Sequence, residues 1–140
     1  MIIYGSSPFT GDTSDQKFHQ TMIKYIADIG NTVLSAHSGK FSSSIPLTEK
    51  QMYKRSLKWI DGSKLMIAEI SGPSIGVGFE ISYAIFKRKI PVLVLCKDDF
   101  QNISAMLYGC DSPLLTLRQY KNIDDMKSIV KTFISKIDRS

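Results

Sequence analysis

The chain has 140 residues, 43% of them hydrophobic and 22% charged, which is the size and composition of one globular domain. Its two cysteines, Cys96 and Cys110, are too few for a secreted disulfide framework and lack zinc-ligand spacing. No apolar stretch approaches the roughly 20 residues that span a bilayer, and no basic segment opens the sequence as in a signal peptide. We therefore expect a cytoplasmic protein that needs no metal or disulfide to fold.

The formal net charge is +5, which by itself is compatible with nucleic acid, a membrane surface or a small anionic ligand. Much of the basic excess lies on and around the last predicted helix, where such residues usually form a solvated face. These residues are Lys121, Lys127, Lys131, Lys136 and Arg139. We therefore predict neither a nucleic-acid nor a membrane partner.

Short apolar, β-rich runs alternate with longer helical patterns along the whole chain, which is typical of repeated βα units. The predicted strands are 2–5, 32–36, 65–70, 91–96 and 114–117. The predicted helices are 14–29, 46–61, 76–87, 102–108 and 123–137. The sequence thus predicts a single doubly wound, Rossmann-like α/β domain over residues 1–140, with a five-stranded parallel sheet and helices on both faces.

The loop after the first strand, residues 4–11, is short and rich in hydroxyl groups. In an open parallel sheet, ligands bind outside the carboxyl ends of the strands, so this loop is a candidate site. Ser6 and the backbone N–H groups could bind an anion while Phe9 presents an aromatic ring to a base. An ordinary turn around a buried Phe9 fits the loop equally well.

The segment that follows the second strand, residues 35–45, is rich in serine and contains glycine, as active-site loops often are. His37 lies at its start and could contact a sugar or a base, although an exposed histidine without function is equally consistent. Neither His19 nor His37 has a Cys, His or Asp at metal-ligand spacing, so no metal site is predicted.

The loop after the third strand, residues 71–78, leads directly into a helix and contains three glycines. A helix amino end offers free N–H donors and a positive dipole, so Ser74 and Gly76 form a candidate phosphate site. This is not the dinucleotide fingerprint, which follows the first strand and needs a further glycine. Glu80 lies one turn beyond Gly76 and could act as a nucleophile or a base. Taken alone, a glutamate in a first turn is more often a surface residue that complements the dipole, and only its pairing with this loop favours a catalytic role.

Glu69 is a second carboxylate, near the end of an otherwise apolar strand. It is either a ligand or ribose contact or a buried acceptor satisfied by backbone donors, and the sequence favours neither. Trp59 is spaced as a core residue of its helix rather than as a platform for a base.

Several of these segments resemble the nucleoside 2-deoxyribosyltransferase superfamily, in particular its 2′-deoxynucleoside 5′-monophosphate N-hydrolases. The matching segments are 4–6, 33–37, 68–70, 73–80 and 103–109. The resemblance implies cleavage of an N-glycosidic bond with Glu80 as the nucleophile and with no cofactor. It further implies that Ser6, Ser74 and Ser104 bind the 5′-phosphate of a nucleoside monophosphate. The resemblance also implies a homodimer in which Ser104 and Met106 come from the neighbouring subunit.

By this resemblance the catalytic candidates are Glu80 and Tyr4. The substrate-binding candidates are Gly5, Ser6, Phe9, His37, Ser56, Glu69, Ser74, Gly76, Ser104 and Met106. The sequence departs from the family at Ser56, where an acidic residue is expected to place the substrate and move protons. Asp61 lies more than one turn further on and does not replace it. The first-strand tyrosine of the family also aligns imperfectly, so Tyr4 would serve from a different register.

Other functions stay open at this point. Phe9 fits the transferase branch of the superfamily, in which another base accepts the sugar. A catalytically silent nucleotide-binding protein would retain Glu80 and lack the acid at Ser56. A flavodoxin-like electron carrier for flavin mononucleotide would use the hydroxyl-rich first loop. A phosphate-receiver domain is less consistent, because the first and third strands do not end in an acidic cluster.

Overall fold

The computed structural model describes residues 1–7, 16–36, 45–72, 74–97 and 103–139. Phe9 and His37, together with the first residues of the predicted helices 14–29 and 102–108, lie outside the described residues.

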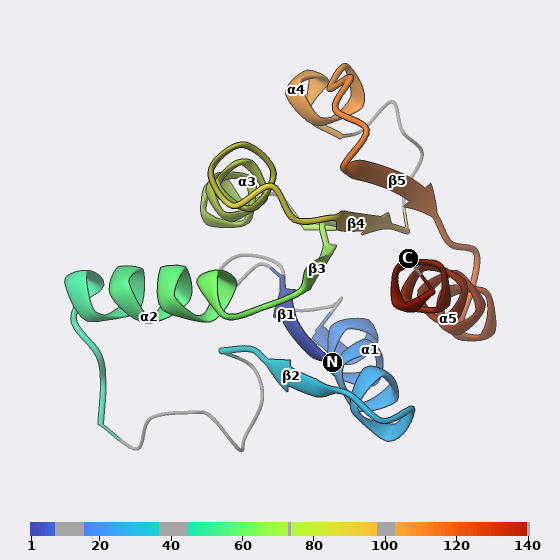
Figure 1. Cartoon of the computed structure of the whole chain (residues 1–140), viewed down its shortest axis with the longest axis horizontal. Coiled ribbons are helices and arrows are strands. Elements are labelled where there is room, and N and C mark those ends of the chain that lie inside the picture. Colours follow the sequence, from blue (N-terminus) through green and yellow to red (C-terminus); the bar gives the residue numbers. More distant parts are fainter. Residues whose placement is uncertain (8–15, 37–44, 73, 98–102, 140) are drawn as a thin grey trace.

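The centre of the protein is one sheet of five parallel strands, in the order β2-β1-β3-β4-β5. The strands are β1 (Ile2–Ser6), β2 (Thr32–Leu34), β3 (Leu65–Glu69), β4 (Val92–Cys96) and β5 (Leu115–Gln119). Every residue of β3 and β4 is buried, as expected for central strands covered on both faces. Figure 1 shows the strands side by side between the helices, and the predicted five-stranded parallel sheet is confirmed.

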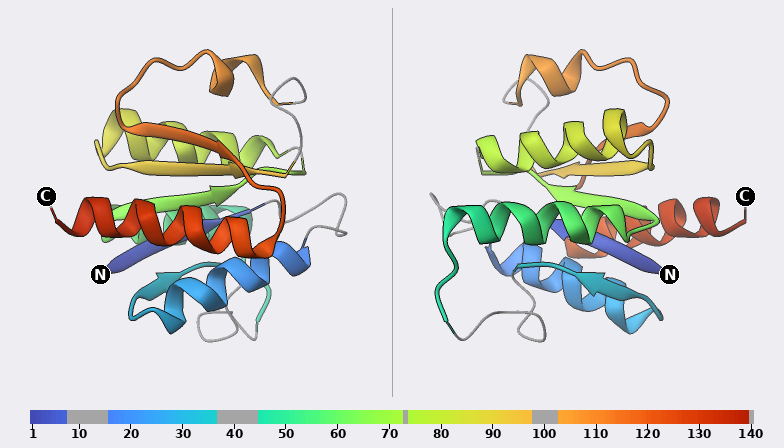
Figure 2. Two further views of the ribbon diagram at one scale, coloured as in Figure 1. Left: turned by 90° about the vertical axis from the view of Figure 1, so that its right-hand side faces the viewer. Right: turned by 60° about the vertical axis from the view of Figure 1, so that its left-hand side comes forward.

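Two helices cover each face of the sheet, and each pair encloses its own apolar core (Figures 1 and 2). On one face lie α1 (Gln16–Asp28) and α5 (Ile123–Asp138), packed on side chains such as Ile3 and Leu93. On the other face lie α2 (Glu49–Asp61) and α3 (Ile75–Ser82). A short helix, α4 (Ala105–Tyr108), follows β4. The predicted helix–sheet–helix layers are therefore confirmed.

The start of α2 differs from the prediction. The helix begins at Glu49 rather than at Pro46, because Thr48 forms a capping box with Gln51. The Thr48 hydroxyl accepts a hydrogen bond from the Gln51 N–H at 3.2 Å, and the Gln51 side chain accepts one from the Thr48 N–H at 2.9 Å. These two hydrogen bonds satisfy two backbone N–H groups at the end of the helix. A helix that began at Pro46 would not have this capping box.

The helix predicted over 76–87 changes its geometry part-way. It is α-helical to Ser82 and continues as a π-helical turn, η2 (Tyr83–Lys87), which the Arg88 N–H closes on the Tyr83 carbonyl at 3.0 Å. Such π turns are uncommon and are often found near functional sites. The turn lies at the end of α3 that is remote from Ser74.

The strand order reverses between β1 and β3, which places a crevice at the carboxyl ends of these two strands. After β1 the chain continues into α1 on one face, and after β3 it continues into α3 on the other. The loops therefore diverge at this point and leave room for a ligand. Within the described residues, no helix has both the length and the apolar character needed to cross a membrane.

Candidate active site

The first strand presents two side chains to the crevice. Side chains alternate along a strand, so Tyr4 and Ser6 face α2 and α3, whereas Ile3 and Gly5 face α1. A Cβ on Gly5 would lie 2.4 Å from Cδ1 of Ile23, so the glycine lets α1 approach the strand closely. Gly5 therefore supports the packing beneath the site, and it does not line the cavity described below.

Glu80, on α3, is bound by both of these β1 side chains. The Tyr4 hydroxyl donates a hydrogen bond to Oε2 of Glu80, and the Ser6 hydroxyl donates one to Oε1 at 3.0 Å. The carboxylate is thus held at the mouth of the crevice by residues more than 70 positions away in the sequence. Two directed donors fix its orientation, as a nucleophile or a base requires.

Burial and hydrogen bonding act in opposite directions on Glu80. Desolvation raises the pKa of its carboxyl above the ordinary value, while hydrogen bonds from Tyr4 and Ser6 and the charge of Arg55 oppose the rise. Burial also raises the pKa of Tyr4, and the negative charge of Glu80 adds to this increase. Tyr4 therefore remains a protonated donor to the carboxylate at neutral pH.

A cavity of about 450 Å³, the catalytic cavity, opens beside Glu80 between β1, α2 and α3. Ser56 lines it and hydrogen-bonds to Tyr4, which lowers the pKa of the phenol and partly offsets the effect of burial. Arg55 also lines it, with Cζ 4.8 Å from the centre of the Trp59 ring. The cavity thus brings the predicted residues Tyr4, Ser6, Ser56 and Glu80 together.

The amino end of α3 forms one wall of the catalytic cavity. Ser74 is the N-cap of this helix, and its hydroxyl accepts a hydrogen bond from the Val77 N–H at 3.2 Å. Gly76 is exposed in the first turn and also lines the cavity. The two residues and the helix dipole offer a suitable place for an anion next to Glu80.

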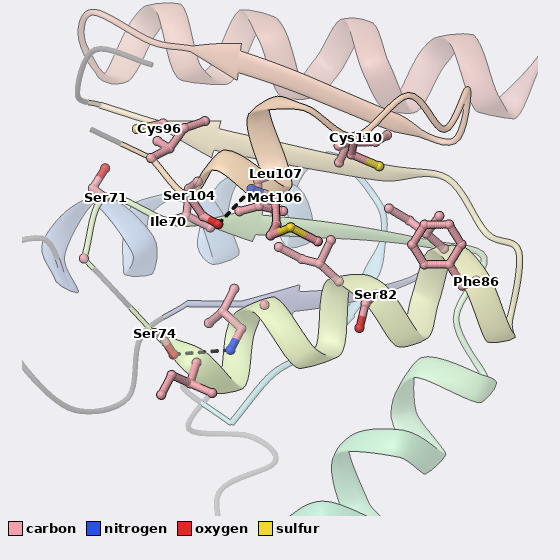
Figure 3. Close-up of a pocket in the computed structure, with 18 residues that line it drawn as sticks. Ile70, Ser71, Ser74, Ser82, Phe86, Cys96, Ser104, Met106, Leu107 and Cys110 are labelled. Carbon is pink, nitrogen blue, oxygen red and sulfur yellow. Dashed lines mark hydrogen bonds between the residues drawn. The ribbon is translucent and has the colours of Figure 1, made fainter. Parts of the chain in front are cut away.

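A second cavity, the apolar cavity, lies on the opposite side of α3 and has a volume of about 610 Å³ (Figure 3). It is bounded by α3, the end of β4 and the short helix α4. Ser104 caps α4 by accepting a hydrogen bond from the Met106 N–H at 3.2 Å. Within one chain, Ser104 and Met106 line this cavity and not the one that contains Glu80.

Glu69 lines neither cavity. Its side chain is 1% exposed, and Oε1 accepts hydrogen bonds from the backbone N–H of Ser71 at 2.7 Å and from the Ser71 hydroxyl. The same hydroxyl accepts a hydrogen bond from the Lys97 N–H at 2.9 Å, which ties the ends of β3 and β4 together. Of the two readings that the sequence left open, these contacts favour the buried acceptor.

Sequence reasoning did not single out Arg55 as a functional residue. The only available signal was its spacing of four residues from Trp59, which places both side chains on one face of α2.

Asp61 lines neither cavity, because its carboxylate accepts a hydrogen bond from Tyr83 at 2.6 Å and pairs with Arg88 at 3.2 Å. Among the described residues, no three His, Cys, Asp or Glu side chains are grouped as a metal site.

Comparison with known proteins gives several relatives. A protein of Methanococcoides burtonii that carries the name 2′-deoxynucleoside 5′-phosphate N-hydrolase 1 is 38% identical over 115 residues, covering 78% of this chain and 90% of that protein. The 5-hydroxymethyl-dUMP N-hydrolase of Danio rerio is 27% identical over the full length of both chains. No family model matches the sequence.

Solved structures share the fold. The CMP N-glycosidase of Clostridium botulinum superimposes with a TM-score of 0.73 at 15% identity, over 95% of this chain and 99% of that one. The 2-deoxyribosyltransferase of Bacillus psychrosaccharolyticus superimposes with a TM-score of 0.65 at 18% identity, over 91% and 90% of the two chains.

The fold and these relatives define the class of protein, an N-glycosidase of the nucleoside 2-deoxyribosyltransferase superfamily. Within that class, and on the strength of the 38% identical relative, the chain belongs to the family of 2′-deoxynucleoside 5′-phosphate N-hydrolases. The resemblance seen in the sequence is confirmed. The relatives support an N-glycosidase rather than a flavodoxin-like electron carrier.

Proposed function

We propose that this enzyme hydrolyses the N-glycosidic bond of 2′-deoxynucleoside 5′-monophosphates, with Glu80 as the nucleophile. The observation that carries the proposal is the carboxylate of Glu80, oriented by Tyr4 and Ser6 beside an anion site at the amino end of α3. The names of the relatives support a nucleotide substrate, and the geometry of the site supports the chemistry.

In the first step an oxygen of Glu80 attacks the anomeric carbon of the sugar as the bond from that carbon to the base nitrogen breaks. The electron pair of this bond leaves with the base, and an ester forms between Glu80 and the sugar. Positive charge that develops on the sugar faces the carboxylate, which stabilises it. Because Tyr4 and Ser6 hold the carboxylate in one orientation, less ordering is required when the substrate binds.

In the second step water attacks the same carbon, the ester bond breaks, and deoxyribose 5-phosphate is released. Glu80 regains its negative charge, and the proton lost by water leaves with solvent. The site is then ready for another substrate.

The 5′-phosphate would bind to Ser74 and to backbone N–H groups near Gly76, where the helix dipole is favourable. The single O–H of Ser6 points at Glu80 in the structure, so binding a phosphate oxygen would require this hydroxyl to turn from the carboxylate to the phosphate. This arrangement favours a monophosphate over a free nucleoside.

We further propose a homodimer in which Ser104 and Met106 complete the partner's site. Met106 is 84% exposed and Ile75 is 95% exposed, and both belong to the apolar cavity around α3. Large apolar side chains exposed together are typical of an interaction surface. Since Ser104 does not line its own chain's catalytic cavity, a role for it in phosphate binding requires a second copy of the chain.

The test is base release from a panel of 2′-deoxynucleoside and ribonucleoside 5′-monophosphates and the matching nucleosides, followed by chromatography. We expect free base and deoxyribose 5-phosphate from the wild type with a deoxynucleoside monophosphate, and none from Glu80→Gln. Adding a second free base distinguishes transfer, which would produce a new nucleotide. If nucleotides raise the Tm but release no base, the protein is a binder and the proposal is wrong.

A further inference from the structure

Arg55 is an unusual feature of the catalytic cavity. It lies on α2, lines the cavity and stacks on Trp59, so its guanidinium is held in place by packing rather than by a carboxylate. It makes no ion pair with any described residue, and no described atom accepts a hydrogen bond from its buried Nε. The guanidinium therefore lowers the pKa of Glu80 through its charge without forming an ion pair, and its buried, unpaired Nε–H calls for a functional explanation.

Breaking the glycosidic bond leaves an electron pair on the departing base. That charge must be met either by a proton from an acid or by a positive group that binds the base. Among the described residues that line the catalytic cavity, Glu80 is the one carboxyl group, and it must be ionised to attack the sugar. Ser56 contributes a hydroxyl that hydrogen-bonds to Tyr4, and the carboxylate of Asp61 is held by Tyr83 and Arg88.

We propose that Arg55 binds the departing base and stabilises its negative charge, so that the bond breaks without a general acid. This role rests on the proposed function of Glu80. As the bond between the anomeric carbon and the base nitrogen breaks, its electron pair is delocalised onto a ring carbonyl oxygen that the guanidinium binds. The base leaves as an anion and takes a proton from water afterwards.

This role selects the kind of base that the enzyme releases. A base with a carbonyl group next to the glycosidic nitrogen, such as a 2-oxopyrimidine, places negative charge where a guanidinium can bind it. A purine has no carbonyl group next to its glycosidic nitrogen, and it leaves most readily after it is protonated. We therefore expect faster release of uracil-type bases than of purines.

The stacking on Trp59 provides a signal that is independent of catalysis, because Trp59 is the single tryptophan of the chain. Free uracil carries no phosphate, so any effect of uracil on Trp59 fluorescence reports the base subsite alone. We expect uracil to change the fluorescence of the wild type and of Arg88→Met. We expect no change in Arg55→Met. Equal responses of all three proteins would overturn the proposal.

The kinetic test uses 2′-deoxyuridine 5′-monophosphates with fluorine, hydrogen or methyl at position 5, which differ in the acidity of the leaving base. Single-turnover release by Arg55→Met should fall about 10- to 100-fold for the methyl compound and much less for the fluoro compound, the range expected for a charge-assisted hydrogen bond. Arg88→Met, which removes an exposed arginine outside both cavities, should match the wild type. Arg55→Lys keeps the charge and should recover part of the loss.

Two results would overturn the role of Arg55. An equal loss for all three bases, seen with the monophosphates and absent with the nucleosides, would make Arg55 a phosphate ligand. If the wild type released purines as fast as uracil, the negative charge on the departing base would be stabilised by a group other than Arg55. If the wild type releases no base from any nucleotide, the proposed function itself fails, and the role of Arg55 fails with it.

Discussion

The two sides of α3 differ in chemistry although they belong to one helix of eight residues. On the side of α2 and β1, Glu80 meets hydroxyl groups and the guanidinium of Arg55 in the catalytic cavity. On the side of α4, apolar residues such as Ile81 and Leu107 line the larger cavity. Ser74, Ile75 and Val77 line both cavities.

This difference separates two tasks. The polar side holds a charged group in a fixed orientation, which is what a chemical step requires. The apolar side exposes Met106 and Phe86 together, which is typical of a surface that is covered in an assembly. Substitutions on the two sides of α3 should therefore change different measurements.

The largest effect should come from Glu80→Gln. Removing the proposed nucleophile should reduce base release by at least about 10³-fold. The Tm at pH 7 should be equal or higher, because burial disfavours the charged form of Glu80 and glutamine carries no charge. Glu49→Gln removes an exposed carboxylate from the first turn of α2 and serves as the control. Loss of activity in both variants, or a large drop in Tm for Glu80→Gln, would contradict this prediction.

Met106→Glu should act on the other side of α3. A charge in place of this exposed apolar side chain should weaken self-association at least about 30-fold, the effect of a substitution at the centre of an interface. Analytical ultracentrifugation over a range of concentrations measures this directly. Ile45→Glu changes an exposed isoleucine that lines neither cavity and should leave the dimer intact. A wild-type protein that stays monomeric would refute the shared site.

Tyr4→Phe should reduce base release about 10-fold and change its pH dependence. The hydrogen bond from Tyr4 favours the charged form of Glu80, so losing it raises the pKa of that carboxyl further. Only the ionised form attacks, so the acidic limb of kcat/KM should move to higher pH. Tyr25→Phe, on α1, is the control. An acidic limb that stays in place, or moves to lower pH, would exclude this role for Tyr4.

The smallest effect should come from Ser74→Ala. Loss of the N-cap should lower the free energy of unfolding by about 1 kcal/mol. Loss of one neutral hydrogen bond to phosphate should raise KM for a monophosphate about 5-fold. Ser82→Ala, in the last turn of the same helix, should change neither value appreciably. An increase in KM that is equally large for the nucleoside would show that Ser74 does not bind the phosphate.

Much of the fold could be predicted because burial leaves a direct trace in the sequence. The strands β3 and β4 are buried along their whole length and appear as continuous apolar runs. The predicted start of α2 at residue 46 is wrong, because the capping box of Thr48 and Gln51 begins the helix at Glu49. The π turn after Ser82 has no signal of its own in the sequence.

The site could be predicted only in part. Tyr4 and Glu80 could both be named as candidates from the sequence. The hydrogen bond between them depends on which face of β1 carries Tyr4 and on where α3 lies, and the structure shows both. Glu69 could not be assigned from the sequence, because a buried acceptor and a ligand look alike until the bonds from Ser71 are seen. Arg55 could be recognised as a site residue only from the shape of the catalytic cavity, which sequence spacing does not reveal.

The central claim is that Glu80 forms a covalent bond to the sugar. The most direct measurement is mass spectrometry of the enzyme quenched during reaction with a 2′-fluoro-2′-deoxynucleoside 5′-monophosphate, whose fluorine slows hydrolysis of the ester. We expect the added mass of the sugar phosphate on the peptide that contains Glu80, and none on Glu80→Gln. A stoichiometric burst of free base with no added mass on that peptide would contradict the account.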